Sequence, residues 1–287
     1  MSGKISRVGI IGAGTMGNGI AQLFASAGCD VVLRDLKPEF VDRGMAAITN
    51  SLDRLVSRGK LSADERAATL SHIKTTTDMG DLADSQMVVE AVLENYDIKA
   101  GVIHELDKLC ADDAIIATNT SSISLTKLAA ASKNPSRVIG MHFFNPVPLM
   151  QLVEIIRAMQ TSDSVCGTVV ELTASLGKTA HVSKDSYGFV VNRVLVPMIN
   201  EAINCVHEGV ASPEDVDEMM KLGANHPMGP LSLADLIGLD VVRNIMQTLQ
   251  AGFDDPKYRP SPLLKQMCDA GYLGRKTGRG FFVYGKH

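Results

Sequence analysis

Tryptophan is absent from this 287-residue sequence, and aromatic residues of all kinds make up only 5% of it. The sequence also lacks any run of lysine and arginine, and its formal net charge is −4. Proteins that bind nucleic acid usually carry a basic stripe, often with interleaved aromatic residues. No apolar stretch approaches the length of about 20 residues that spans a bilayer. We therefore expect a small-molecule partner, with neither nucleic acid nor a membrane involved.

The cysteines also exclude some classes of protein. The five, Cys29, Cys110, Cys166, Cys205 and Cys268, are odd in number, widely scattered and never in CxxC spacing. This pattern argues against a disulfide framework and against a metal site. We expect free thiols in a reducing cytoplasm and no bound metal. Because the first expected strand begins within a few residues of the start, we also expect no signal peptide.

The most informative stretch runs from Arg7 to Asp35. The apolar run Val8–Ile11 is typical of a strand buried on both faces, and a helical apolar pattern follows up to Gly28. Between them lies the GxGxxG spacing, formed by Gly12, Gly14 and Gly17 with Ala13, Thr15 and Met16. Such a loop combines a tight turn, close backbone approach to a pyrophosphate and close helix-strand packing. The stretch therefore predicts a dinucleotide-binding unit.

An acidic residue ends the second expected strand of this unit. Asp35 lies about 20 residues past the glycines, where a carboxylate can bind a ribose diol and repel the extra phosphate of NADP. NAD is therefore the expected cofactor. Arg34 and Lys37 could instead neutralise a 2′-phosphate, although beside Asp35 they are expected to be solvated surface charges.

The segment between Asp35 and the next expected strand, residues 73–76, is longer than one crossover helix needs. Its apolar pattern predicts an amphipathic helix, and Ser62 with Glu65 forms a capping-box pattern that begins another. We expect a helical hairpin inserted after the second strand and extending over the ligand site. Ser51, Arg54, Arg58 and Lys60 lie on or just past its first helix, where a merely solvated polar face is the alternative interpretation.

Two later strand ends carry polar residues. The expected strand 115–118 is followed by Asn119, Thr120, Ser121 and Ser122, at a position that faces the nucleotide crevice in doubly wound folds. Either serine could instead be only a helix N-cap.

His142 directly follows the next expected strand, residues 138–141, and Glu154 lies within the apolar run 152–156 that comes after the loop. An unpaired carboxylate inside a strand is costly to bury, so Glu154 needs a partner. If the two strands are antiparallel and the chain reverses near Val147 and Pro148, His142 and Glu154 lie opposite each other. An imidazole held by a carboxylate is a general base, and we expect this pair to be catalytic rather than structural.

The character of the sequence changes after Ser183. The expected fold is α/β, a Rossmann-type mostly parallel sheet with the inserted hairpin over residues 1–184, followed by a smaller all-helical domain over 185–287. In the second domain, residues 189–206 are apolar almost all round, which predicts a buried helix kinked at Pro197. Asn192 lies near its start. This much apolar surface suggests a homodimer, with a monomeric core as the alternative.

Together these motifs resemble the L-3-hydroxyacyl-CoA dehydrogenase family, in particular the bacterial enzymes that act on 3-hydroxybutyryl-CoA. The resemblance extends nearly end to end, through GIIGAGTMGNGIAQ, NTSSIS, GMHFFNPVPLMQLVEI, GFVVNRVLVPMINEA, MKLGANHPMGPLSLAD and GRKTGRGFFVY. It implies reversible hydride transfer between (S)-3-hydroxybutyryl-CoA and NAD, giving acetoacetyl-CoA and NADH, in fatty acid or butanoate metabolism. HFFNP and GRKTGRG in this order are far more specific than the glycine motif.

The resemblance also implies roles for individual residues. His142 is the catalytic base, Glu154 its partner, Ser121 a hydrogen-bond donor to the substrate oxygen, and Asn192 an orienting residue. Glu94, Lys99 and Asn119 match positions near the ribose and nicotinamide of the cofactor. Ser51, Arg58 and Asn145 match positions that contact coenzyme A, and with Arg54, Ser121 and Asn192 they complete the expected substrate-binding set.

Two positions depart from the family pattern. Tyr187 stands where relatives often have proline before a glycine, so the interdomain hinge is expected to be less rigid, and Thr118 stands where serine is common. Two other functions remain open: a dehydrogenase that does not use coenzyme A, such as L-gulonate dehydrogenase, and a non-catalytic NAD-binding protein such as lambda-crystallin. The presence of Ser121, His142, Glu154 and Asn192 counts against the second.

Overall fold

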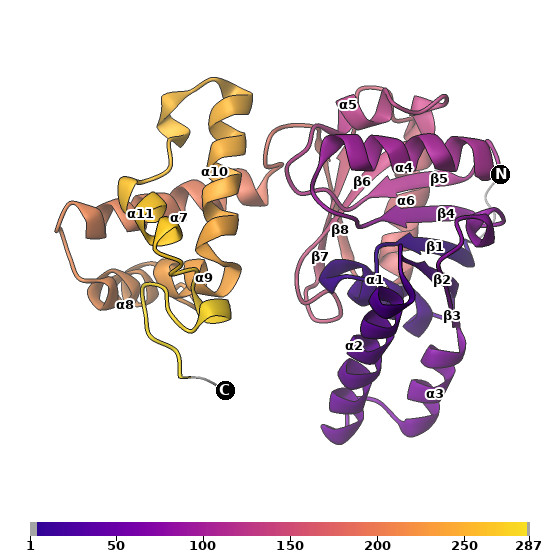
Figure 1. The fold of residues 1–287 in the computed structure, drawn as a ribbon, viewed down its shortest axis with the longest axis horizontal. Coiled ribbons are helices and arrows are strands. Elements are labelled where there is room, and N and C mark those ends of the chain that lie inside the picture. The colour runs from indigo at the N-terminus through magenta and orange to yellow at the C-terminus, as the bar shows by residue number, and fades with distance from the viewer. Residues whose placement is uncertain (1–4, 286–287) are drawn as a thin grey trace. The chain divides into compact units, whose positions relative to one another are not determined.

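An eight-stranded sheet organises the first part of the chain (Figure 1). In this computed structural model, residues 5–285 are described, and the chain divides into two units, Met1–Asp185 and Ser186–His287. The strands are β1 Arg7–Ile11, β2 Asp30–Arg34, β3 Ile73–Thr76, β4 Met87–Glu90, β5 Ile115–Thr118, β6 Val138–Phe143, β7 Leu152–Arg157 and β8 Thr179–Lys184. They lie in the order β3-β2-β1-β4-β5-β6-β7-β8.

All neighbouring strands are parallel except β6 and β7, which are antiparallel. The chain order reverses between β1 and β4. In doubly wound sheets, ligands bind at the carboxyl ends of the strands around such a point. The predicted Rossmann-type fold is therefore confirmed, and its ligand edge is the one where the glycine motif and the polar strand ends lie.

Six helices accompany this sheet in the described part of the first unit: α1 Thr15–Ser26, α2 Pro38–Ser57, α3 Ala63–Ser71, α4 Tyr96–Leu109, α5 Leu125–Ala129 and α6 Asp163–Ser175, with short 3-10 turns η1 Gly80–Leu82 and η2 Pro135–Arg137. Figure 1 shows α2 and α3 extending from the sheet as the predicted hairpin. Ser62 and Glu65 form the predicted capping box at the start of α3. An ion pair of 2.6 Å from Arg66 Nε to Asp53 Oδ1 joins the two helices.

The core of the first unit lies around the central strands. Every residue of β4, β5 and β6 is buried, as is typical of strands covered on both faces. Phe24 of α1 and Ile48 of α2 pack into this core with no exposed surface. Rigid packing behind the strands fixes the polar residues at their carboxyl ends.

The second unit is helical, as predicted. It contains α7 Val191–His207, α8 Pro213–Ala224, α9 Pro230–Ile237, α10 Leu239–Phe253 and α11 Pro262–Asp269, with 3-10 turns η3 Pro256–Tyr258 and η4 Arg275–Thr277. Its core is formed by apolar side chains of α7, α9, α10 and α11, among them Ile199, Leu231, Met246 and Leu264. No helix among residues 5–285 is long and apolar enough to cross a membrane.

The prediction that the helix beginning near Phe189 is buried on all sides was wrong for this chain. Val190 is 55% exposed and Val194 is 67% exposed. Only Val196, Ile199, Asn200, Ala202 and Ile203 of α7 are buried. The sequence shows that these faces are apolar, but the neighbouring helices α8, α9, α10 and α11 leave Val194 exposed. Pro197 lies inside α7, which continues through it.

Two buried aspartates explain the glycine-rich motifs of the second unit. Asp217 accepts hydrogen bonds from the N–H groups of Leu231 and Ser232 at the start of α9. Asp235 accepts them from the N–H groups of Phe281 and Phe282 and from the Tyr284 hydroxyl. A Cβ atom at Gly280 would lie 1.9 Å from Asp235 Oδ1, so only glycine fits there. The GRKTGRGFFVY segment thus has a structural role, because it binds Asp235 of α9.

Candidate active site

The glycine loop after β1 has the geometry of a nucleotide-binding turn. Gly12 has a φ of +100°, which favours glycine, and a Cβ atom at Gly17 would lie 1.7 Å from the Gly12 carbonyl oxygen. A Cβ atom at Gly14, in contrast, would meet nothing within 4 Å. The first and third glycines are therefore needed for packing within the protein, while the second leaves backbone open to an approaching ligand.

Asp35 lies beside this loop. Its Oδ2 atom accepts a hydrogen bond of 2.7 Å from the Ala13 N–H, and its Oδ1 atom accepts one of 2.6 Å from the Leu36 N–H. A hollow of about 400 Å³ is lined by Ala13, Gly14, Thr15, Asn18, Asp35, Phe40 and Arg43. A carboxylate, an open glycine and a helix N-terminus around one hollow fit a ribose and pyrophosphate.

The two cations that could have accommodated a 2′-phosphate have other partners. Arg34 Nε donates to the Thr77 carbonyl oxygen at 3.3 Å, and Lys37 Nζ lies 5.8 Å from the Phe40 ring centroid. Arg43 stacks over the same ring at 4.8 Å and lines the hollow. The sequence analysis missed Phe40 and Arg43, because no spacing rule marks the first turns of the helix after β2.

His142 and Glu154 lie opposite each other in the antiparallel β6–β7 register. His142 Nδ1 is 2.8 Å from Glu154 Oε2, and the residues are only 6% and 3% exposed. The Phe144 ring lies 4.6 Å from the imidazole, centroid to centroid. An ionised carboxylate only accepts hydrogen bonds, so this contact places the proton on Nδ1 and leaves Nε2 as the nitrogen that can accept another. The pair can therefore act as a general base.

Glu94 organises the loop after β5. Its Oε1 atom accepts hydrogen bonds from the Thr120 hydroxyl at 2.7 Å, the Ser121 N–H at 2.8 Å and the Ser122 N–H at 2.9 Å. The hydroxyls of Ser121 and Ser122 also lie within 3.2 Å of this oxygen. Burial raises the pKa of Glu94, but the charge of Lys99 and these hydrogen bonds outweigh it, and the net pKa is lowered. Glu94 is thus an anion that holds Ser121 in place.

Neither serine caps the following helix. The N-cap of α5 is Ser124, whose hydroxyl accepts from the Lys127 N–H at 3.3 Å. The N-cap interpretation of Ser121 and Ser122 is therefore wrong, because α5 begins later than its apolar pattern indicated. Asn119 connects the same loop to β6, since its Oδ1 atom accepts from the Phe143 N–H at 3.0 Å.

Lys99 is buried beneath this loop. Its side chain is 1% exposed, and Nζ lies 2.8 Å from Glu90 Oε1 and 3.3 Å from Glu94 Oε2. Glu90 itself is fully buried, and its Oε2 atom accepts from the Thr118 hydroxyl at 2.7 Å. The sequence analysis missed Glu90, although the argument that singled out Glu154, an acid ending an apolar strand, applies to it equally.

The remaining predicted residues lie on other elements. Ser51 and Arg54 are on α2 and Arg58 is its C-cap, so the hairpin carries all three. Arg54 lines a shallow surface hollow with Ala47, Asn50, Asp53 and Ser57. Asn145 is exposed in the loop after β6, and Asn192 lies in the first turn of α7 in the second unit.

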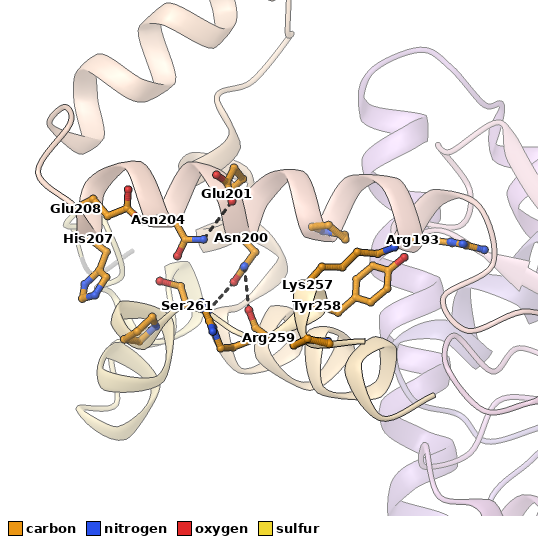
Figure 2. Close-up of a pocket in the computed structure, with 13 residues that line it drawn as sticks. Arg193, Asn200, Glu201, Asn204, His207, Glu208, Lys257, Tyr258, Arg259 and Ser261 are labelled. Atoms are coloured by element: carbon orange, nitrogen blue, oxygen red, sulfur yellow. Dashed lines mark hydrogen bonds between the residues drawn. The ribbon is translucent and has the colours of Figure 1, made fainter. Parts of the chain in front are cut away.

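The second unit has a groove of about 730 Å³ between α7 and the segment from Pro256 to Pro262 (Figure 2). Figure 2 shows Asn200 bridging this groove, because its amide donates to the Arg259 carbonyl oxygen and accepts from the Ser261 N–H. Glu201 similarly accepts from Asn204. Asn200 and Asn204 thus bind other groups that line the groove, and none of the predicted site residues lines it.

Comparison with known proteins gives consistent matches along the whole chain. The family model of the 3-hydroxyacyl-CoA dehydrogenase NAD binding domain matches residues 7–186, and the model of the 3-hydroxyacyl-CoA dehydrogenase C-terminal domain matches residues 188–284. The chain is 55% identical to a probable 3-hydroxybutyryl-CoA dehydrogenase of Deinococcus radiodurans, over 97% of this chain and 100% of that protein. It is 51% identical to 3-hydroxybutyryl-CoA dehydrogenase of Clostridioides difficile, over 98% and 100%.

Solved structures also match this chain over nearly its whole length. The crystal structure of (S)-3-hydroxybutyryl-CoA dehydrogenase from Ralstonia eutropha matches with a TM-score of 0.95 and 54% identity, covering 98% of this chain and 100% of that one. FadB2 of M. tuberculosis matches with a TM-score of 0.97 and 45% identity, covering 99% and 100%.

Proposed function

The chain belongs to the 3-hydroxyacyl-CoA dehydrogenase family, and on this premise we propose that it interconverts (S)-3-hydroxybutyryl-CoA and acetoacetyl-CoA, with NAD as the hydride acceptor. The observation that carries this proposal is the buried His142–Glu154 pair, 2.8 Å apart at the ligand edge of an NAD-binding sheet. Relatives that are more than half identical bear the names of enzymes for this reaction, which supports it over a sugar-acid dehydrogenase or a non-catalytic protein.

Three residues perform the proton chemistry. His142 takes the proton of the substrate hydroxyl on Nε2, and Glu154 stabilises the imidazolium that forms. The Ser121 hydroxyl, which donates to Glu94 Oε1 at 3.2 Å, turns to donate instead to the substrate oxygen as that oxygen becomes a carbonyl. NAD, when bound, supplies the hydride acceptor. Because an imidazole can both accept a proton and give it back, such a base serves both directions of the reaction.

The other site residues position the two ligands. Gly12, Gly14, Thr15, Met16 and Gly17 hold the pyrophosphate, and Asp35 binds the adenosine ribose and selects NAD over NADP. Glu94, Lys99 and Asn119 serve the ribose and nicotinamide. Ser51, Arg54, Arg58 and Asn145 bind the coenzyme A portion, and Asn192 orients the acyl group.

We further propose that residues 1–184 bind the cofactor, that residues 185–287 complete the substrate site, and that the second part forms a homodimer. Exposed apolar side chains support the dimer: Val194 on α7 is 67% exposed, and Met219 and Leu222 on α8 are 64% and 78% exposed. Free, widely spaced cysteines support a cytoplasmic location.

A substrate comparison tests the function. The purified protein is assayed for NADH oxidation with acetoacetyl-CoA, and for NAD reduction with L-gulonate, with NADPH in parallel. We expect turnover with acetoacetyl-CoA and NADH far above the others; turnover of only the free acid would refute the proposal. Light scattering should give twice the chain mass of 30.7 kDa, and a monomer would refute the dimer.

A further inference from the structure

We propose that Glu90 is a positioning residue of the dehydrogenase site, which holds the Thr120–Ser121 segment in place through two separate branches of hydrogen bonds and ion pairs. This inference rests on the function proposed above for Ser121. Glu90 ends β4, directly before the turn that lies against the glycine loop, and it is fully buried. A buried carboxylate persists only where its charge and lone pairs are satisfied, so its partners reveal what it holds.

The first branch runs through Thr118. The Thr118 hydroxyl donates to Glu90 Oε2 at 2.7 Å and accepts from the Thr120 N–H at 3.2 Å. Because the Thr118 hydroxyl uses its hydrogen to donate to the carboxylate, its lone pairs are free to accept, and they accept from the Thr120 N–H, one residue before Ser121. The carboxylate therefore sets the orientation of the hydroxyl, and the hydroxyl holds the loop.

The second branch runs through Lys99 and Glu94. Lys99 Nζ lies between Glu90 Oε1 and Glu94 Oε2, at 2.8 and 3.3 Å. Glu94 then binds the Thr120 hydroxyl and the Ser121 N–H. Both branches end on Thr120, and the second also reaches Ser121. In addition, the Asn119 N–H donates to the Glu90 carbonyl oxygen at 2.8 Å, which ties the start of the loop to the same residue.

A neutral amide cannot replace this carboxylate. Glu90 Oε1 also accepts from the Val92 N–H at 2.6 Å, so the two carboxylate oxygens together receive three donors. In Glu90→Gln the amide NH₂ would face two donors if it took the place of Oε1, or would force the Thr118 hydroxyl to turn and accept if it took the place of Oε2. In either case Lys99 would lose its nearest counter-charge. We expect both branches to loosen together.

The experiment compares this variant with a matched buried ion pair on the same helix. Asp107, like Lys99, belongs to α4, and its carboxylate pairs with buried Arg137 at 2.7 Å. Glu90→Gln and Asp107→Asn therefore make the same chemical change in the same unit. Hydrogen exchange followed by mass spectrometry reports on residues 118–123 whether or not the protein is active, and steady-state kinetics with acetoacetyl-CoA reports on the site.

Glu90→Gln should speed amide exchange in residues 118–123 at least about tenfold and lower kcat/KM about 10- to 100-fold, as small misplacements of reacting groups do. Asp107→Asn should lower Tm but leave that exchange and kcat/KM within about threefold of wild type. If both variants lose only Tm, the inference is overturned.

If Glu90→Gln does not fold, Thr118→Val provides the test, because it removes only the first branch. Faster amide exchange in Thr118→Val, with the wild-type rate restored in Thr118→Ser, supports the inference. Unchanged exchange in Thr118→Val refutes it. Wild type inactive on acetoacetyl-CoA would refute the proposed function, while the exchange data would still decide the inference.

Discussion

His142 Nδ1 lies 2.8 Å from Glu154 Oε2, and the two residues face each other across an antiparallel strand pair in a mostly parallel sheet. Glu154→Gln keeps the size of the side chain but removes the charge that stabilises an imidazolium. We expect kcat to fall by roughly two to four powers of ten, with NADH affinity nearly unchanged. Stopped-flow kinetics and NADH fluorescence titration measure the two quantities. A kcat near wild type would show that the carboxylate has no part in the chemistry.

Asp35 should control the choice of cofactor. Asp35→Asn keeps an oxygen that can accept from the Ala13 N–H but removes the negative charge. Two like charges near a protein surface repel by roughly 1.4 kcal/mol or more, so the preference for NADH over NADPH should fall about tenfold. The ratio of kcat/KM for the two cofactors measures this. An unchanged ratio would assign the selectivity to another residue.

Ser121 and Ser122 form a matched pair, because Glu94 Oε1 binds the N–H and the hydroxyl of each. Ser121→Ala should lower kcat/KM about 100-fold, as loss of a donor to the reacting oxygen does. Ser122→Ala, which removes a similar bond without touching substrate, should cost less than about threefold. Equal losses in both variants would mean that the hydroxyls only stabilise the loop.

Arg54 and Arg58 should bind the anionic end of coenzyme A. Arg54→Ala and Arg58→Ala are expected to raise KM for acetoacetyl-CoA about three- to tenfold without changing kcat, and the effect should shrink with added salt. An acetoacetyl thioester of N-acetylcysteamine lacks the phosphates and should be unaffected. Lys221→Ala, in a surface pair with Glu218 on α8, provides a charge-matched control. If KM does not move, the hairpin does not bind coenzyme A.

The ion pair between Asp107 and Arg137 should make stability depend on pH. Burial raises the pKa of Asp107, but hydrogen bonds from Arg137, the Lys133 N–H and Ser132 outweigh it, so the pKa lies below its ordinary value. A lowered pKa in the folded state means that the stabilisation is present above about pH 3.9, the unfolded value, and is lost as pH falls through the folded pKa. Asp107→Asn should cost about 3 to 5 kcal/mol of unfolding free energy at pH 7. Urea melts should show the difference between variant and wild type shrinking below about pH 4; a constant difference would contradict the account.

The strands and the His142–Glu154 pairing could be predicted from sequence because they depend on local signals. Two short apolar runs joined by a loop containing Val147 and Pro148 can pair in few registers. Burial of the Glu154 carboxylate favours the register in which His142 lies opposite it. The glycine spacing fixes the nucleotide turn for a similar reason, since a Cβ atom at Gly12 or Gly17 would collide with backbone.

The role of Glu90 could not be predicted as directly, because two of its partners come from other elements of the chain. Lys99 contacts it from α4 and Thr118 from the neighbouring strand β5.

The exposure of α7 was missed for a different reason. A pattern of apolar residues shows which faces avoid water but not what covers them, and Val194 remains exposed within the single chain.

The most direct test of the central claim is the rate of NADH formation from (S)-3-hydroxybutyryl-CoA at saturating NAD, measured for wild type, His142→Gln and His181→Gln. His181 lies next to Glu154 in the β7–β8 register but is exposed, so it controls for the loss of an imidazole near that carboxylate. We expect kcat to fall by two to four powers of ten in His142→Gln and to stay within about threefold of wild type in His181→Gln. Near-normal turnover by a folded, NAD-binding His142→Gln would contradict it.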